Sequence, residues 1–468
     1  MLISAFVMAT GIEGVTEELR AIVSSRHVLA GADISDDYTH DEVLNLPGVK
    51  PALVVVPGTT DEVARILRVA DARRIPVTVR GAGTGMSGAC IPSEGGLVVS
   101  TARMKKIEID AENHIAVVEP GATLGELDEA TRPHGLCYPV QPGEDTASLG
   151  GNVATNAGGM RAVKYGVTRN QVLGLTAVLP SGEVIECGGK FVKASSGYDL
   201  TQLIIGSEGT LAVVTRILLK LYPRLTERTA LLAPFENVGQ ITRAVPKIVQ
   251  SGASPLFVEY LDALSMAGVC KRQDIDLGIA EEVKQKALAY LLVLIEGRSE
   301  ARNEEDAQTI GAVCLEHGAL DVFVLPKNQA GKVIKGREES FWAGKAAGLS
   351  DQVDVVVPRA SLSAYMEKAQ EIGTAHGTFI VGTGHAGDGN VHLGIFQPDP
   401  EVRARVMNAL FDVGASMGGI VSAEHGIGLA KKKYYVAREN TDKLALMRRI
   451  KAAFDPHGIM NPGKVFDP

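Results

Sequence analysis

The chain has 468 residues, of which 45% are hydrophobic and 22% are charged, and its formal net charge at pH 7 is −8. This length corresponds to roughly two or three domains, and the composition is that of an ordinary globular protein with sizeable cores. The negative charge and the absence of an extended basic stretch argue against a protein that binds nucleic acid.

Cysteine spacing and hydropathy indicate the expected compartment. The five cysteines are scattered without a C-x-x-C pair, which argues against a disulfide framework or an iron–sulfur cluster and for a reducing compartment. Residues 1–8 are apolar but lack a basic region, so we do not interpret them as a signal peptide. No apolar run approaches the length of a membrane span. We therefore expect a cytoplasmic protein with no integral membrane segment.

The first regular elements are predicted between residues 53 and 80. Residues 53–56 form a short apolar run that is typical of a strand. Thr60 and the two acidic residues after it indicate the start of an amphipathic helix that extends to about residue 73. Residues 76–80 predict the next strand. Together these elements form a β-α-β unit.

A glycine-rich loop at residues 81–88 follows this unit. Its Gly83, Gly85 and Gly88 match the G-x-G-x-x-G string of dinucleotide-binding folds, but that fold also requires a helix that opens at the loop. Here a strand at residues 97–99 follows, so nicotinamide binding is not expected. Consecutive glycines expose backbone N–H groups that bind anions without a helix. The loop therefore predicts a phosphate cradle, with a glycine-rich hairpin as the alternative.

Two further segments are rich in glycine and in side chains with hydroxyl or amide groups. Residues 143–159 consist almost entirely of small residues, which let the backbone approach a flat ligand closely. Strand-like runs at residues 115–118 and 172–179 flank this segment and argue against a disordered linker. Residues 206–211 form a third turn of this kind and lead into a strand. Three such segments in the first half of the chain indicate one large cofactor.

The second half of the chain has a different pattern. Between residues 225 and 380, strand-like runs such as 291–295 alternate with amphipathic helical runs such as 238–250. This alternation favours an α+β domain built on an antiparallel sheet. The last segment, residues 401–468, predicts helices.

Two short motifs in this half carry histidines. His385 and His392 are seven residues apart in a glycine-rich segment, and Glu424 and His425 follow later in the chain. Residues 390–395 alternate as in a strand, and the glycine-rich turn before them allows both imidazoles to reach one centre. Two histidines and a carboxylate with open positions are a recurrent catalytic set for Zn, Mn or Fe(II). The motifs therefore predict a metal site; the alternative is a pair of buried histidines bonded to the backbone.

Taken in order, these motifs resemble those of the FAD-linked oxidases of the vanillyl-alcohol-oxidase type. Within that family the chain is similar to the D-2-hydroxy-acid dehydrogenases, a group that includes D-lactate dehydrogenase and the flavin-binding chain of glycolate oxidase. The resemblance covers nearly the whole chain. The segments that carry it are residues 57–63, 80–88, 150–159, 206–211, 384–392, 424–428 and 461–464.

The resemblance implies an α+β fold with a two-part FAD-binding domain of the vanillyl-alcohol-oxidase (PCMH) type and an α+β cap domain on an antiparallel sheet. Residues 1–222 would form the FAD-binding domain, residues 223–419 the substrate (cap) domain, and residues 420–468 a C-terminal helical segment that returns to the FAD domain. The residues assigned to FAD are Arg80, Gly81, Ala82, Gly83, Thr84, Gly85, Ser87, Gly88, Pro142, Gly143, Ser148, Gly151, Asn152, Thr155, Asn156, Gly158, Gly159, Glu208, Gly209, Val213 and Asn461. Relatives with covalent flavin place a histidine in the first glycine loop; this chain offers Thr84 there, so non-covalent FAD is expected.

The resemblance also assigns catalytic roles. His385, His392 and Glu424 match the ligands of a divalent metal (Zn, Mn or Fe), and His425 matches the catalytic base. A metal on the hydroxyl and carboxylate oxygens of a 2-hydroxy acid favours loss of the hydroxyl proton. A neutral histidine is a suitable acceptor for that proton near pH 7.

Three residues are expected to bind the substrate: Arg359, Lys345 and Asn390. Arg359 would supply the cation for the substrate carboxylate. Many relatives have an arginine where this chain has Lys345, and lysine keeps the charge but loses the bidentate fork. This departure leaves the identity of the substrate open.

The implied reaction is the oxidation of a small D-2-hydroxy acid, such as D-lactate or glycolate, to the 2-oxo acid, with the hydride passing to flavin N5. The electrons must then leave the flavin, so the expected partner is an electron-transfer flavoprotein, or sister subunits that carry an iron–sulfur cluster and contact quinone. Two alternatives stay open: a hydroxy-acid oxidase that uses oxygen, and a non-catalytic flavin subunit of a larger complex. The oligomeric state is also open, with a homodimer as one option.

Overall fold

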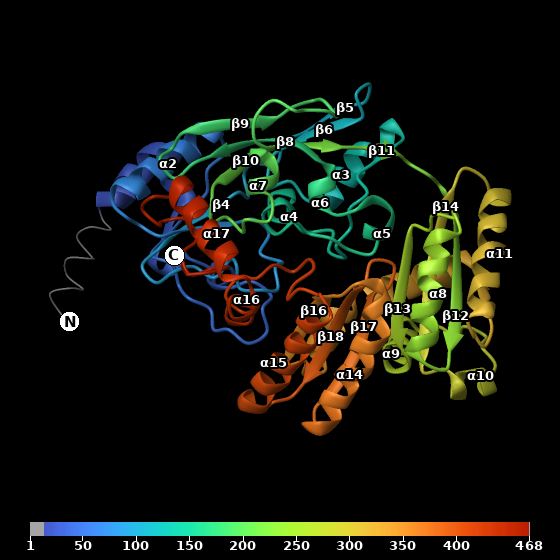
Figure 1. Ribbon diagram of the computed structural model, residues 1–468. Helices are drawn as coiled ribbons and strands as arrows, with labels where there is room; N and C mark the ends of the chain where they lie inside the picture. Colours follow the sequence, from blue (N-terminus) through green and yellow to red (C-terminus); the bar gives the residue numbers. More distant parts are fainter. Residues whose placement is uncertain (1–13, 468) are drawn as a thin grey trace.

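The computed structural model describes residues 14–467, which fold into two halves that are built on separate β-sheets (Figure 1). Residues 1–8, which we do not interpret as a signal peptide, lie outside the described residues. The N-terminal half carries the first two large sheets, and the second half carries one large sheet with long helices around it.

The first sheet has the strand order β1-β2-β4-β3. Its strands are β1 (Val28–Ala30), β2 (Leu53–Val55), β3 (Val77–Arg80) and β4 (Leu97–Ser100). Both β2 and β3 pair with β4 in parallel, and α2 (Thr60–Ala72) connects β2 to β3 as predicted. The hydroxyl of Thr59, one residue before the predicted start, accepts the Glu62 N–H at 3.1 Å and caps α2. Because β3 and β4 run parallel, the loop between them is not a hairpin.

The second sheet is antiparallel, with the order β5-β6-β10-β8-β9. Its strands are β5 (Ile107–Asp110), β6 (Ile115–Val118), β8 (Val172–Val178), β9 (Val184–Gly188) and β10 (Val213–Lys220), and β7 (Leu136–Cys137) pairs separately with β11 (Tyr222–Pro223). The helices of this region are α3 (Leu124–Thr131), α4 (Leu149–Thr155), α5 (Ala162–Tyr165), α6 (Thr168–Gln171) and α7 (Leu200–Ile204). Helix α4 lies inside the second glycine-rich segment, where the sequence predicted no helix. The Ser148 hydroxyl caps it by accepting the Gly151 N–H at 3.3 Å.

The third sheet confirms the antiparallel sheet predicted for the second half. Its order is β15-β12-β14-β13-β17-β18-β16, and every neighbouring pair is antiparallel. The strands are β12 (Glu227–Phe235), β13 (Phe257–Asp262), β14 (Ala289–Gly297), β15 (Phe323–Leu325), β16 (Asp351–Val356), β17 (Phe379–His385) and β18 (Asn390–Phe396). The helices between them are α8 (Val238–Gln250), α9 (Ala263–Gln273), α10 (Glu281–Lys286), α11 (Glu300–Glu316), α12 (Lys327–Glu338), α13 (Ser340–Ala346), α14 (Leu362–Ala375) and α15 (Pro400–Ser416). Short 3-10 helices elsewhere are Ser25–His27, Gly31–Asp33, Asp36–Thr39, Arg132–His134 and Arg359–Ser361.

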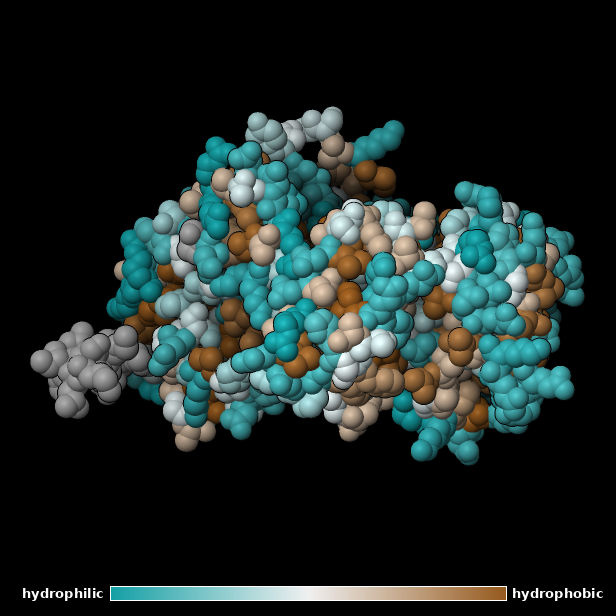
Figure 2. All heavy atoms as spheres, turned by 60° about the horizontal axis from the view of Figure 1, so that its bottom comes forward, coloured by the Kyte–Doolittle hydropathy of each residue, from teal (hydrophilic) through white to brown (hydrophobic). Residues whose placement is uncertain are grey.

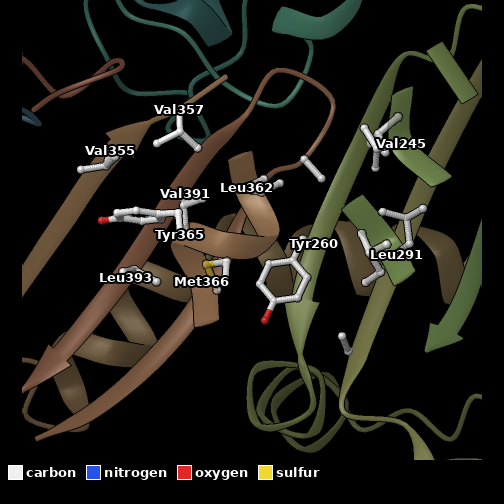
Figure 3. Close-up of a cluster of buried hydrophobic side chains, with 14 of the residues drawn as sticks. Val245, Tyr260, Leu291, Val355, Val357, Leu362, Tyr365, Met366, Val391 and Leu393 are labelled. Atoms are coloured by element: carbon white, nitrogen blue, oxygen red, sulfur yellow. The ribbon is translucent and has the colours of Figure 1, made fainter. Parts of the chain in front are cut away.

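Both faces of the third sheet are buried, which explains why its strands are almost continuously apolar. On β12, Leu231 and Phe235 pack into one hydrophobic cluster and Leu232 packs into another. The first cluster includes side chains of α8, α11, α14 and α15, and the second includes side chains of α9 and α12. Figure 3 shows Tyr365 and Met366 of α14 directed onto this sheet. This packing holds β17 and β18 rigidly.

The C-terminal segment returns to the N-terminal half. Helices α16 (Lys432–Arg438) and α17 (Thr441–Phe454) leave the third sheet, and Figure 1 shows them in red beside the blue N-terminal elements. Met460 forms a parallel bridge with Val77, and the Asn461 side chain donates to the carbonyls of Ala89 and Glu208 at 3.0 and 2.7 Å. The predicted boundaries at residues 222 and 419 stay a prediction.

Tyr365 provides a test of the packing around the third sheet. The side chain is 0% exposed, and its hydroxyl has no hydrogen-bond partner among the described residues. We expect Tyr365→Ala to lower the free energy of unfolding by about 3–5 kcal/mol because it leaves a large cavity. Tyr365→Phe should instead be neutral or stabilising by about 1 kcal/mol, since it removes an unpaired buried hydroxyl. Urea unfolding of the two variants measures both effects, and equal destabilisation by both would contradict this packing.

Hydrophobic residues are scattered among hydrophilic ones on the face of the molecule that Figure 2 presents. Isolated apolar residues of this kind are normal for a protein surface. Within residues 14–467, no helix combines the length and the apolar character that a membrane crossing requires. The histidines and carboxylates of the two predicted motifs are largely buried in the interior of the molecule.

Candidate active site

The two predicted histidines lie on one β-hairpin. His385 is the last residue of β17, not a residue of the turn as predicted, and His392 is the third residue of β18. The strands pair so that Thr383 is opposite His392 and His385 is opposite Asn390. The ring centroids of His385 and His392 are 5.1 Å apart. The hairpin thus brings both imidazoles to one centre, as the motif predicted.

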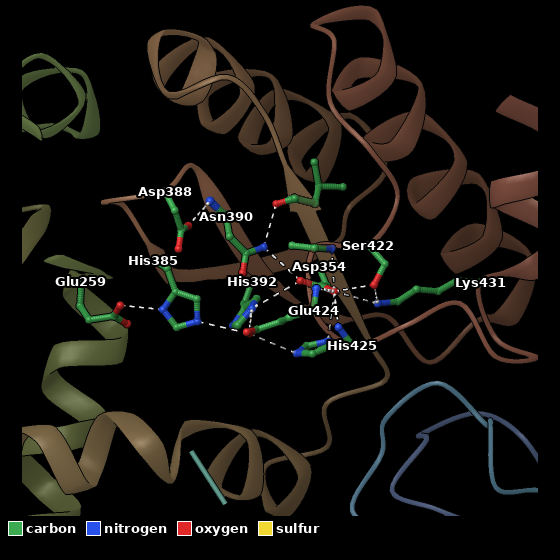
Figure 4. A network of polar contacts seen from close by, with 12 residues as sticks. Glu259, Asp354, His385, Asp388, Asn390, His392, Ser422, Glu424, His425 and Lys431 are labelled. Carbon is green, nitrogen blue, oxygen red and sulfur yellow. Dashed lines mark hydrogen bonds and ion pairs between the residues drawn. The ribbon is translucent and has the colours of Figure 1, made fainter. Parts of the chain in front are cut away.

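Glu424 and His425 approach this hairpin from the segment after α15 (Figure 4). The Oε1 atom of Glu424 lies 3.0 Å from His392 Nε2, 3.2 Å from His385 Nε2 and 3.9 Å from His425 Nε2. All of these side chains are at most 11% exposed. A Cβ atom on Gly158 would lie 2.6 Å from Glu424 Oε2, so the second glycine-rich segment leaves room for this carboxylate.

Asp354 on β16 holds the segment that carries Glu424 and His425. Its Oδ2 accepts the hydroxyl of Ser422 at 2.6 Å and the backbone N–H groups of Glu424 and His425 at 3.1 and 2.9 Å. Its Oδ1 accepts the Asn390 amide at 3.0 Å. The carboxylate is 0% exposed. Sequence reasoning did not assign Asp354 to the site, because its partners are distant in the chain.

The electrostatics of this cluster favour bound positive charge. Burial alone would raise the pKa of Glu424, but His385 and His392 hold it well below its usual range. Burial would lower the pKa of His385, but Glu259 and Glu424 raise it well above its usual value. Burial lowers the pKa of His425 to about 4, which leaves this imidazole neutral at pH 7. The neighbouring carboxylates therefore favour the protonated form of His385, whereas His425 is neutral and can accept a proton.

A divalent metal fits these residues. Asp354, His392, Glu424 and His425 each offer one ligand atom, and these atoms all lie within 4.8 Å of one another. The buried Nε2 of His392 has no hydrogen-bond partner of good geometry among the described residues. Histidine nitrogens and carboxylate oxygens are ligands for Zn, Mn or Fe(II). This compact group includes Asp354 in place of the predicted His385.

His385 has a further carboxylate partner. Its Nδ1 lies 2.6 Å from Oε1 of Glu259, a fully buried residue on β13. A carboxylate on the far nitrogen of a histidine fixes the ring and raises its basicity, as around many metal ligands. Sequence reasoning missed Glu259, and only its position as an acidic residue between the apolar neighbours Val258 and Tyr260 could have marked it.

The glycine-rich segments line one long cavity, which we call the glycine cavity. Its lining includes Gly81, Ala82, Gly83, Thr84, Gly85, Pro142, Gly143, Ser148, Gly151, Asn152, Thr155, Gly158, Glu208 and Gly209, all of which the resemblance assigns to FAD. The other residues assigned to FAD, which do not line this cavity, are Arg80, Ser87, Gly88, Asn156, Gly159, Val213 and Asn461. The three segments predicted to share one large cofactor therefore do surround a single space.

The first glycine loop has the geometry of a close cradle. Gly83 has a φ of 80°, and a Cβ there would lie 2.1 Å from the guanidinium of Arg80. A Cβ on Gly81 would lie 2.0 Å from Ser148 Oγ. Only glycine lets the loop pack this tightly. The exposed backbone suits the pyrophosphate of a dinucleotide, so the residues present fit FAD.

A second cavity, which we call the histidine cavity, contains the cluster. Its lining includes Arg337, Glu338, His385, His392, Glu424 and His425. It shares with the glycine cavity the residues Met86, Pro142, Gly143, Glu338, Phe341, Glu424 and His425. The cluster therefore lies where a cofactor in one cavity would meet a small ligand in the other.

The three residues predicted to bind substrate are not among those that line this junction. The Lys345 ammonium pairs with Glu42 at 2.6 Å, and Arg359 is exposed. Asn390 is buried and donates to Asp354 and to the Val355 carbonyl. Of the described residues that line the two cavities, none is Lys345, Arg359 or Asn390.

Family models and known proteins match most of this chain. The family profile "FAD binding domain" matches residues 51–188, and the profile "FAD linked oxidases, C-terminal domain" matches residues 224–465. An uncharacterized FAD-linked oxidoreductase of Mycobacterium tuberculosis (strain ATCC 25618 / H37Rv) is 50% identical over 96% of this chain and 98% of its own length. The D-lactate dehydrogenase of Archaeoglobus fulgidus is 37% identical over 92% of this chain and 96% of its own. The structure of p-cresol methylhydroxylase with substrate bound superimposes with a TM-score of 0.82 at 18% identity and covers 97% of both chains.

The chain belongs to the FAD-linked oxidases, with a PCMH-type FAD-binding domain and an FAD-oxidase C-terminal domain. It is an FAD-linked oxidoreductase that is homologous to D-lactate dehydrogenase over most of its length. These comparisons confirm the predicted family and fold class.

Proposed function

We propose that the protein is an FAD- and divalent-metal-dependent dehydrogenase that oxidises a small D-2-hydroxy acid, such as D-lactate or glycolate, to the 2-oxo acid. The observation that carries this proposal is the position of His425. It is a neutral buried imidazole at the junction of the glycine and histidine cavities, 3.9 Å from Glu424. The name of the A. fulgidus relative supports the same substrate class.

The residues in and beside the histidine cavity would have separate roles as general base and as metal ligands. His425 would accept the proton of the substrate hydroxyl as general base. His392, Glu424 and Asp354 would hold the metal, with His385 beside Glu424. A divalent metal there would polarise the substrate oxygens. Thr84 stands where covalent relatives place a histidine, so the residues of the glycine cavity would hold FAD without a covalent bond, and the bound flavin would supply the acceptor for the hydride of the substrate Cα.

Partner and location belong to the same proposal. The electrons would leave through an electron-transfer flavoprotein or an iron–sulfur subunit, with a homodimer as one option for the assembly. We also propose a cytoplasmic location. The five free cysteines support a reducing compartment.

Anaerobic titration of the purified flavoprotein tests the proposal. D-lactate, L-lactate, glycolate and D-2-hydroxyglutarate are added separately, and the oxidised flavin absorbance is followed. We expect bleaching by a D-acid or by glycolate and none by L-lactate. A flavin that stays oxidised with all four acids would contradict the proposed substrate class.

Glu338 gives this function a specific pH dependence. It lies at the end of α12 and lines both cavities, and Gln141 donates to its Oε1 at 3.1 Å. Burial, together with Asp145, raises its pKa to about 7, against the opposing charges of Arg161 and Arg337. Glu339 adds a further negative charge nearby. Glu338 is therefore neutral below pH 7 and becomes an anion above it.

We expect the KM for D-lactate to rise as the pH increases through about 7, because ionised Glu338 repels the substrate carboxylate. Two like charges about 10 Å apart at an effective dielectric constant of about 20 give about a tenfold effect. Glu338→Gln keeps an acceptor for Gln141 and should make the KM nearly constant between pH 6 and 8.5. Steady-state KM profiles of both proteins check this, and an unchanged slope in the variant would assign the effect to another group.

A further inference from the structure

We propose that Arg337, rather than Lys345 or Arg359, binds the substrate carboxylate in the histidine cavity. This inference rests on the proposed function and narrows it. It assigns the substrate carboxylate to the one lysine or arginine side chain that lines this cavity among the described residues. It also limits the substrate class to 2-hydroxy acids with a single carboxylate.

The composition of the cavity lining is the first reason. Among the described residues that line the histidine cavity, Arg337 is the only lysine or arginine. Lys345 is 43% exposed and already pairs with Glu42, and Arg359 is exposed on a 3-10 helix. A carboxylate that enters the cavity therefore meets one permanent cation, and that cation is Arg337.

The surroundings of the Arg337 side chain are the second reason. It is only 8% exposed, and its Nη2 lies 2.9 Å from Oε2 of Glu259. This ion pair is its only charged contact among the described residues, and neither Nε nor Nη2 forms a hydrogen bond of good geometry. A guanidinium has five N–H donors. A carboxylate has two acceptor oxygens, so it can accept hydrogen bonds from the N–H groups of Arg337 that have no such partner.

The link from Arg337 to the histidine cluster is the third reason. Glu259 contacts Arg337 through Oε2 and His385 Nδ1 through Oε1, at 2.9 and 2.6 Å. His385 Nε2 then lies 3.2 Å from Glu424. One rigid chain of contacts therefore fixes the guanidinium relative to the cluster that would hold the hydroxyl end of the substrate. A carboxylate on Arg337 and a hydroxyl near His425 would orient the same small molecule.

The remaining lining limits what else the substrate can carry. Met160, Phe341, Leu349 and Phe396 contribute apolar surface, and Glu338 contributes a carboxyl group. A second carboxylate on the substrate would find no second cation there and would approach Glu338. The cavity therefore favours a short apolar substituent on the hydroxy acid over a dicarboxylate.

The test compares D-lactate with D-lactamide, which has the same shape without the carboxylate charge. In the flavin-reduction assay we expect Arg337→Gln to raise the KM for D-lactate about 100-fold, near the low end for loss of one partner of a buried charge pair. In the wild type the KM for D-lactamide should exceed the KM for D-lactate, and in Arg337→Gln this ratio should fall about 100-fold. Lys345→Met and Arg359→Gln serve as matched controls and should leave both values within about twofold. If Arg337 had only a structural role, Arg337→Gln would raise the KM for D-lactate and the KM for D-lactamide by the same factor.

The outcomes separate this inference from the proposed function. If no 2-hydroxy acid reduces the wild-type flavin, the proposed function fails and the inference fails with it. If the wild type is active and Arg337→Gln keeps its preference for D-lactate, only the inference is overturned. Should Arg337→Gln not yield a folded flavoprotein, Arg337→Lys decides, because it keeps the charge opposite Glu259 and loses the fork. A raised KM for D-lactate in that variant supports the inference, and a normal KM overturns it.

Discussion

Replacement of His425 by alanine should slow the reduction of bound flavin by D-lactate by about 10²–10⁴-fold, the usual contribution of a general base. The neutral imidazole lies at the junction of the two cavities and adjoins Glu424. No other histidine with a lowered pKa lines either cavity among the described residues. Anaerobic stopped-flow measurement at saturating substrate gives the rate of the chemical step directly.

The control for this variant is His457→Ala. His457 is 36% exposed and contacts Asp71 far from the cavities, so its loss should leave the rate unchanged. FAD and metal content are measured on both variants. If His425→Ala retains both cofactors and the wild-type rate, another group takes the proton and the proposed mechanism is wrong.

Loss of the metal should have an effect of similar size. The charge stabilisation that a bound metal supplies is worth several kcal/mol, so treatment with a chelator should reduce turnover about 100-fold or more. Glu424→Gln should abolish metal retention, because Glu424 contacts His385 and His392 together. Metal analysis of the purified proteins, with activity before and after readdition of Zn, Mn or Fe(II), checks this expectation.

A second comparison identifies the ligands themselves. The family resemblance assigns His385, whereas the compact group of ligand atoms includes Asp354. We expect His385→Ala and Asp354→Asn to reduce the metal content unequally, and the larger loss marks the direct ligand. Asp388→Asn is the matched control, since Asp388 is on the same hairpin and its side chain accepts the Asn390 N–H at 3.1 Å through an oxygen that asparagine also offers. Full metal retention in Glu424→Gln would contradict a metal site at this cluster.

Local signals in the sequence predicted many elements of the fold. Helix α2 was predicted from the residues at its start and α8 from its amphipathic pattern, and the bounds of α8 match the predicted 238–250. Helix α4 was missed because its Leu149–Thr155 sequence includes two glycines, which disfavour helix. Its cap at Ser148 and its packing against the first glycine loop override that preference.

The same holds for the candidate site, where local sequence signals predicted some of the residues and missed others. His385 and His392 could be paired from the sequence, because a hairpin brings residues at this spacing together. Glu259, Arg337 and Asp354 were not predicted, since each reaches the cluster from a different strand of the third sheet or from a helix packed on it. Arg359 and Lys345 were chosen by resemblance, and the structure leaves them outside both cavities.

The sequence by itself determined the family, the antiparallel second half, the glycine-rich segments that line one cavity and the histidine hairpin, because these depend on residues close together in the chain. Only the tertiary structure decided which charges meet in the histidine cavity. Antiparallel pairing places Glu259 of β13 near His385 of β17, and α12 then brings Arg337 against Glu259. Such contacts join residues that are far apart in sequence. They form because a charge that becomes buried when the sheet and its helices pack together is costly unless it is paired.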